Sequence, residues 1–285
     1  MLKVYMPVVL GVLLSWGILE TALYFYQKET QPVPSVSVQL EERPSSERVF
    51  VQVKTTEELA EKLKDFDRLA VPRIYIENFP GDFSWNADPA LFVKALLPYI
   101  LYQNEQLEAE RKELFKISTK IFNNQPLTEQ EQSFFNALVT KYEVFEVGPL
   151  SQAHELLQRV DKVSPSLAMA QALDTTQGGK INLDAPFGIY KWNEKGLYDR
   201  ERYPTLEKAV EEYVSQLNKA ESYYRWRGLR TIHRPTKYAL PGRVFLKGLA
   251  PYEPDNPDYI ERIRGVYNQY LLDNLDFAKL EEGEN

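Results

Sequence analysis

Apolar residues are distributed unevenly along the chain, and the longest apolar run lies at its start. Val4 to Leu19 contains no charged residue, and the apolar character continues past Glu20 to Tyr26. A helix of about 23 residues rises about 34 Å, which is enough to cross the ~30 Å hydrocarbon core of a bilayer. The run therefore predicts a transmembrane helix within residues 1–27. A cleaved signal peptide is the alternative, although no small-x-small cleavage site ends the run.

The segment that follows has the composition of a tether. Residues 28–50 are rich in proline, serine and charged side chains, which favours an extended linker. Lys3 and the α-amino group favour a cytoplasmic N-terminus, although Lys28 weakens this charge asymmetry. The chain after Gln27 is therefore expected on the far side of the membrane.

Beyond the linker, apolar positions recur mainly at helical spacing, which predicts a mainly α fold. We divide it into a helical N-terminal subdomain (51–142), a central domain (143–235) and a C-terminal loop and helix (236–285). The clearest amphipathic helix follows Thr205, a good N-cap. Its buried stripe is predicted to comprise Leu206, Ala209, Val210, Tyr213, Val214 and Leu217.

Local signals predict several further elements of the domain. Capping boxes are predicted where Glu58 follows Thr55 and where Glu131 follows Thr128. A strand is predicted from Val71 to Ile76. A long helix is expected to start at Asp88-Pro89, and a final helix is expected from Asp258 to Leu275.

The segment from Val163 to Gly188, VSPSLAMAQALDTTQGGKINLDAPFG, carries the candidate chemistry. Ser164 is a good N-cap and Pro165 suits the first helical position, which predicts a short buried helix to about Leu173. The glycine pair after this helix and the later Pro-Phe-Gly predict a compact loop. Such a loop can form the wall of a cleft.

This segment resembles the endo-β-N-acetylglucosaminidase family, and more closely its bacterial Bax-type branch, which is similar to glycoside hydrolase family 73. The signature of that branch runs roughly S-L-x-x-A-Q-A-x-x-E-S-x-W-G, a spacer, then N-L-F-G. The matching residues here are Ser166, Leu167, Ala170, Gln171, Ala172, Gly179, Phe187 and Gly188. Further likeness is found in Phe92 to Leu114, Glu155 to Leu167 and Arg202 to Arg230. The resemblance implies a lysozyme-like helical domain with a short β or loop wall.

The catalytic position departs from the family pattern. The family has a Glu there, which acts as the general acid, whereas this chain has Thr175. A threonine hydroxyl cannot deliver a proton to a leaving sugar oxygen at a useful rate. Thr176 and Gly178 also replace the Ser and Trp of the signature. The resemblance therefore implies a pseudoenzyme with a degenerate catalytic motif.

Hydrolysis would need a substitute carboxylate, and Asp174 is the nearest. Its side chain points roughly 100° away around the helix from the position of the family's Glu. The resulting displacement of the carboxylate exceeds the ~1 Å tolerance of catalytic groups. Asp184 and Glu194 in the following loop are further candidates. For all three residues, a solvated loop carboxylate is the alternative interpretation.

The resemblance implies that a glycan lies across Gln171, Thr175, Phe187 and Tyr203. Tyr203 precedes the helix capped by Thr205, so an aromatic packed beneath the helix entry is the alternative for this residue. The expected protein is a single-pass protein of the bacterial inner membrane whose periplasmic domain binds peptidoglycan glycan strands. Two alternatives stay open: an active β-N-acetylglucosaminidase that uses Asp174, and a scaffold or regulator that binds another cell-envelope protein.

Charge and composition narrow the classes of partner. The net charge of −7 and the isoelectric point near 5.2 argue against nucleic acid. Lys219 to Lys247 is a local exception, with eight basic residues against the single acid Glu221. This segment is interpreted either as a solvated basic face over packed aromatics or as a surface that holds peptidoglycan carboxylates. Its aromatic residues are Tyr223, Tyr224, Trp226, Tyr238 and Phe245.

Metal and cofactor chemistry has little support in the sequence. The chain has no cysteine and only two histidines, His154 and His233, which do not form a zinc-binding pattern. Neither a P-loop nor a G-x-G-x-x-G motif is present. We therefore expect no cofactor.

Overall fold

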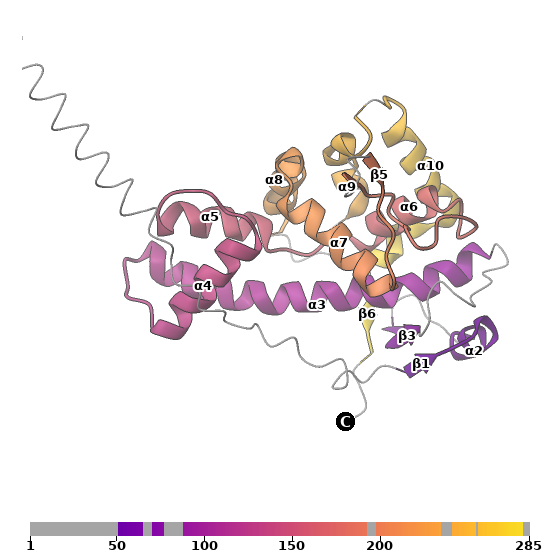
Figure 1. Cartoon of the computed structure of the whole chain (residues 1–285), viewed down its shortest axis with the longest axis horizontal. Helices are drawn as coiled ribbons and strands as arrows, with labels where there is room; N and C mark the ends of the chain where they lie inside the picture. Colours follow the sequence, from indigo (N-terminus) through magenta and orange to yellow (C-terminus); the bar gives the residue numbers. More distant parts are fainter. Residues whose placement is uncertain are drawn as a thin grey trace, which may run out of the picture. The chain divides into compact units, whose positions relative to one another are not determined.

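The central element of the fold is the 34-residue helix α3 (Pro89–Phe122). It starts as predicted, because the Asp88 side chain accepts a hydrogen bond from the Ala90 backbone N–H and Pro89 follows directly. Figure 1 shows α3 crossing the domain. On one side lie α5 (Pro149–Arg159), α6 (Pro165–Thr175) and α7 (Leu206–Lys219), and on the other lie β1 (Val51–Val53) and β3 (Ile74–Ile76).

The structure, a computed structural model, describes residues 51–64, 70–76, 88–192, 198–234, 241–254 and 256–281. They belong to one unit, Arg43–Asn285. The predicted transmembrane helix and linker lie outside the described residues. Among the residues that are described, no helix combines the length and the apolar character needed to cross a bilayer.

The remaining helices complete a mainly helical domain, which confirms that coarse prediction. They are α2 (Thr56–Lys62), α4 (Glu129–Lys141), α8 (Tyr224–His233), α9 (Gly242–Phe245) and α10 (Tyr259–Tyr270). Short 3₁₀ turns cover Glu221–Tyr223, Leu246–Tyr252 and Leu272–Phe277. The predicted stripe of α7 is buried at all six positions, because α7 packs against α3.

Helix starts follow the local sequence signals closely. Thr128 and Glu131 form the predicted capping box at the start of α4. Thr55 caps α2 by accepting from the Glu58 backbone N–H, but the Glu58 carboxylate accepts from Lys54 instead of closing the box. Thr205 caps α7 as predicted.

Within the described residues the strands form three separate pairs, and one prediction here is wrong. The expected strand from Val71 to Ile76 is split by Pro72, which has no N–H to continue a ladder. Its first part, β2 (Ala70–Val71), pairs in parallel with β6 (Lys279–Leu280), and its second part, β3, pairs in parallel with β1. An antiparallel hairpin is formed by β4 (Tyr190–Trp192) and β5 (Tyr198–Arg200).

The predicted C-terminal helix is also shorter than expected. The α10 helix ends at Tyr270, and Leu271 adopts a left-handed conformation with φ of 53°. A 3₁₀ turn then carries the chain to Phe277. The left-handed residue redirects the chain so that this turn packs against α6.

Candidate functional site

The α6 helix is the structural centre of the candidate site. Ser164 caps it and Pro165 occupies its first turn, as the sequence predicts. Its residues up to Leu173 are buried, because α3, α10 and the 3₁₀ turn Leu272–Phe277 pack around it. Small residues such as alanine allow these neighbours to approach closely. Asp174 and Thr175, at the C-terminal end of α6, are the two residues of this helix that are not buried.

The loop after α6 depends on backbone conformations that favour glycine. Gly178 and Gly179 have φ of +74° and +85°. A Cβ added to Gly179 would lie 2.9 Å from the Phe92 Cβ, so no larger residue fits without movement. Thr176 ends the helix by donating to the Ala172 carbonyl and accepting from the Gly179 N–H. The loop therefore packs directly on α3.

A cleft of about 690 Å³ opens at the C-terminal end of α6. This volume is within the range of roughly 300–1,000 Å³ typical of sites for small ligands. Its lining residues come from α6, the following loop, the β4–β5 hairpin and the region of α10. They are Asp174, Thr175, Gln177, Ile181, Asn182, Phe187, Gly188, Tyr190, Arg200, Tyr252, Glu253 and Arg262.

Three of the five predicted site residues line this cleft: Asp174, Thr175 and Phe187. Thr175, at the position of the family's catalytic Glu, packs its side chain over Gly188. A Cβ on Gly188 would lie 3.1 Å from the Thr175 Cγ2 atom. The Phe187 side chain is buried and stacks on Tyr213, with ring centroids 4.1 Å apart. Its contribution to the cleft is therefore mainly structural.

The Asp174 carboxylate is held by an arginine. Arg262 Nε donates to both of its oxygens, at 2.9 and 3.0 Å. The same guanidinium donates through Nη2 to the Glu253 Oε1 atom at 2.6 Å, and Asn256 donates to the other oxygen of Glu253 at 2.8 Å. These contacts raise the pKa of Arg262 above its ordinary range, chiefly through the hydrogen bond to Glu253. Both carboxylates of the cleft are thus engaged as hydrogen-bond acceptors.

Gln171 does not line the cleft, contrary to the role expected from the resemblance. It is only 1% exposed. Its Oε1 accepts from the Tyr213 hydroxyl and its Nε2 donates to the Tyr259 hydroxyl, both at 2.6 Å. Burial raises the pKa of both tyrosines well above the ordinary value. Gln171 therefore links α6 to α7 and α10 through buried hydrogen bonds and has a structural role next to the cleft.

Tyr203 is likewise buried and does not line the cleft. Its hydroxyl donates to Glu201 at 3.1 Å, and its N–H donates to the Asp184 carbonyl at 2.7 Å. The geometry therefore fits the packing role beneath the entry of α7. The Asp184 carboxylate pairs with Arg202 at 2.5 Å, and Glu194 lies outside the described residues.

Sequence reasoning missed several residues of the cleft. Glu253 and Arg262 follow α6 by about eighty residues, so no local pattern connects them with it. Tyr190 and Arg200 face each other in the register of the β4–β5 hairpin. Tyr190-Lys191-Trp192 alternates aromatic and polar residues, but Tyr198-Asp199-Arg200 does not, so the sequence carries only a weak signal for this hairpin.

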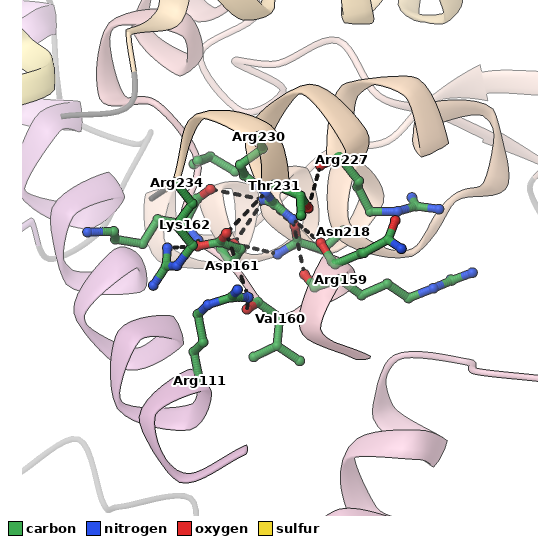
Figure 2. Close-up of polar contacts among 12 residues, drawn as sticks. Arg111, Arg159, Val160, Asp161, Lys162, Asn218, Arg227, Arg230, Thr231 and Arg234 are labelled. Atoms are coloured by element: carbon green, nitrogen blue, oxygen red, sulfur yellow. Dashed lines mark hydrogen bonds and ion pairs between the residues drawn. The ribbon is translucent and has the colours of Figure 1, made fainter. Parts of the chain in front are cut away.

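In the basic segment Lys219 to Lys247, Arg227 and Arg230 are buried, whereas Arg225, Arg243 and Lys247 are exposed. Figure 2 shows the buried Asp161 between Arg111, Arg230 and Arg234. Arg230 is fully buried and donates to the backbone carbonyls at the C-terminal end of α5 and just beyond it. Tyr223, Trp226 and Phe245 are buried, whereas Tyr224 is exposed. Tyr238 lies outside the described residues.

The two histidines do not contribute to the cleft lining. His233 packs edge-on against Phe245, and His154 lies on α5. Among the described residues, no group of three or more histidine, aspartate or glutamate side chains is placed to hold a metal ion.

Comparisons with known proteins leave the family open. No protein-family model matches the chain, and no curated protein or solved structure matches it either.

Proposed function

We propose that this chain is a peptidoglycan-binding pseudoenzyme of the endo-β-N-acetylglucosaminidase-like kind. In this proposal, a lysozyme-like periplasmic domain is anchored to the bacterial inner membrane by the N-terminal helix. The proposal rests on the resemblance of Val163 to Gly188 to the Bax-type signature. The observation that carries it is a cleft at the end of α6, where the family has its catalytic Glu.

The cleft supports binding because it combines polar and aromatic groups. Tyr190 is 44% exposed at the cleft, and the Tyr252 ring stacks on Tyr259 at 5.9 Å. The C–H faces of sugar rings pack well on such aromatic rings. Asn182 and Gln177 add amide groups for sugar hydroxyls and acetamido groups.

The same cleft gives little support to hydrolysis. A general acid must present a proton to the glycosidic oxygen. Both oxygens of Asp174 accept hydrogen bonds from Arg262, and Glu253 contacts Arg262 and Asn256. Neither carboxylate is arranged as a donor, and the Thr175 hydroxyl is too weak an acid. We therefore propose that the chain binds glycan without hydrolysing it.

The test is incubation of the full-length chain, in detergent, with purified peptidoglycan sacculi. The proposal predicts that the protein pellets with the sacculi and releases no soluble muropeptides. Release of products that end in N-acetylglucosamine would instead establish an active enzyme. In that case Asp174→Asn abolishes release and Thr175→Ala leaves it intact if Asp174 is the acid. A chain that stays in the supernatant favours the scaffold alternative.

A further inference from the structure

Arg200 occupies a prominent position in the cleft. It lies at the end of β5, opposite Tyr190 in the hairpin register. Its Nη2 atom donates to the Tyr190 hydroxyl at 3.2 Å, and its guanidinium carbon lies 5.4 Å from the centroid of the Tyr190 ring. Both residues line the cleft. The tyrosine therefore holds the guanidinium in place at the cleft wall.

The charge of Arg200 has no ion-pair partner among the described carboxylates. Across the part of the chain that the structure describes, no aspartate or glutamate lies within ion-pair distance of it. Its Nε atom is buried and has no hydrogen-bond acceptor there. The other arginine of the cleft, Arg262, differs because it pairs with Asp174 and Glu253. Those two carboxylates pair with Arg262 and form no ion pair with Arg200, although the four charged residues of the cleft lining sum to zero net charge.

A buried N–H without an acceptor is unfavourable, and native proteins rarely leave one unsatisfied. Because Nε itself is covered, a ligand oxygen in the cleft would instead bind the terminal N–H groups of the same guanidinium and balance its charge. The planar guanidinium matches carboxylates especially well, because its N–H groups can donate in parallel. Stacking on Tyr190 restricts its motion and so lowers the entropy lost on binding.

We propose that Arg200 and Tyr190 form a subsite for the carboxylate of an acidic glycan. The inference rests on the proposed function and assigns the residues that would distinguish β-1,4-linked strands that contain N-acetylmuramic acid from neutral polymers of N-acetylglucosamine. The carboxylate has two sources. One is the lactyl group of a muramic acid without its peptide, and the other is a carboxylate of the stem peptide.

The experiment measures binding of the full-length chain, in detergent, to three soluble oligosaccharides. They are denuded peptidoglycan strands, strands that retain stem peptides, and chitooligosaccharides of equal length. The variant is Arg200→Gln. The matched control is Arg225→Gln, because Arg225 contacts Tyr224 in a similar way, at 2.9 Å and 5.7 Å, but does not line the cleft.

The wild-type chain and Arg225→Gln are expected to prefer the carboxylated strands. Arg200→Gln should lose about tenfold in affinity for them, the scale of one charge-assisted hydrogen bond, and keep its affinity for the chitooligosaccharide. Arg200→Lys, which retains the charge without the planar donors, should keep part of the preference. Loss confined to denuded strands identifies the lactyl carboxylate, and loss confined to peptide-bearing strands identifies the stem peptide.

Equal binding of all three oligosaccharides by both the wild-type chain and Arg200→Gln overturns the inference and leaves the proposed function standing. Binding of none by the wild-type chain overturns the proposed function itself. Thermal unfolding of each variant checks the fold. If Arg200→Gln unfolds early, Arg200→Lys decides: a reduced preference with a wild-type melting temperature supports the subsite, and an unchanged preference overturns it.

Discussion

At the scale of single residues, two glycines show how backbone conformation shapes this site. Gly179 has φ of +85°, and an added Cβ would lie 2.9 Å from Phe92. Gly228 lies within α8, and an added Cβ there meets no atom within 4 Å. The loop beside the cleft thus requires its glycine, whereas the helix does not.

Alanine substitutions should therefore have opposite effects at these glycines. Gly179→Ala is expected to lower the free energy of unfolding by at least ~1–2 kcal/mol from the left-handed conformation alone. Gly228→Ala is expected to raise it by about 0.5–1 kcal/mol, because alanine is the better helix former. Urea unfolding measures both. A destabilised Gly228→Ala, or an unaffected Gly179→Ala, would contradict the described backbone.

Asp276 makes a pH-dependent connection at the start of α6. Its carboxylate accepts from the Ser164 hydroxyl at 2.7 Å, from the N–H and hydroxyl of Ser166 at 3.0 and 2.7 Å, and from the Gly242 N–H at 2.8 Å. Burial nevertheless raises the pKa of Asp276 above its ordinary value. The folded state therefore binds this proton more tightly than the unfolded chain does.

The sign of the effect follows from linkage. The contribution of the Asp276 proton to stability is complete below the ordinary aspartate pKa of about 4 and is lost as pH rises through the raised pKa. The stability difference between wild type and Asp276→Asn should therefore be largest in acid and shrink toward neutral pH. Urea titrations from pH 4 to 7 measure it. A difference that grows with pH would show that the pKa is lowered instead.

The roles of side chains were predictable from the sequence where their hydrogen-bond partners are close in the chain. Ser164 and Thr205 were recognised as caps because they bond to groups three residues away. Gln171 was assigned to the ligand from the resemblance, and its hydrogen-bond partners, Tyr213 and Tyr259, lie 42 and 88 residues away in the chain. Only the folded chain brings them together.

At the scale of elements, arginines from two other helices hold the C-terminal end of α5. Arg111 of α3 donates to the carbonyls of Leu157 and Val160, and Arg230 of α8 donates to those of Gln158 and Arg159. Positive charge at this end also complements the helix dipole. Burial lowers the pKa of Arg230 to about 9, which leaves the guanidinium charged at neutral pH. This clamp joins α3, α5 and α8.

Removal of the buried guanidinium should be costly. Arg230→Met is expected to lower the free energy of unfolding by about 3–5 kcal/mol, because it leaves buried carbonyls unpaired and deprives Asp161 of a nearby positive charge. The exposed Arg225→Met is the matched control on the same helix and should change it by less than about 0.5 kcal/mol. Chemical denaturation compares them, and equal effects would mean that the clamp contributes little.

Elements were predictable where a local pattern defined them, as for α6 and the stripe of α7. Pairings between distant segments were not. The β2 strand pairs with β6, whose two residues carry no distinctive pattern. The basic residues of α8 suggested a surface, but the burial of Arg227 and Arg230 depends on carbonyls supplied by other elements.

At the scale of the whole molecule, the cleft is assembled from segments that are far apart in the sequence. The likeness of one short segment to a known signature drew attention to the end of α6, which forms part of the cleft lining. It did not reveal Arg262, which pairs with both Asp174 and Glu253, or the hairpin that carries Tyr190 and Arg200. The interpretation as a binding protein therefore depends on long-range contacts.

The most direct test asks whether glycan binding occurs in this cleft. Ile181 lines the cleft and is 41% exposed, and Ile232 lies on α8, outside the cleft, at 72% exposure. Ile181→Glu should obstruct the cleft and repel an acidic glycan without disturbing the core, and Ile232→Glu is the matched control.

The measurement is co-sedimentation of the full-length variants with peptidoglycan sacculi. We predict that the wild-type chain and Ile232→Glu pellet, that Ile181→Glu stays in the supernatant, and that none of them releases muropeptides. Pelleting of Ile181→Glu to the wild-type extent, or release of muropeptides by the wild-type chain, would contradict a binding cleft without catalysis.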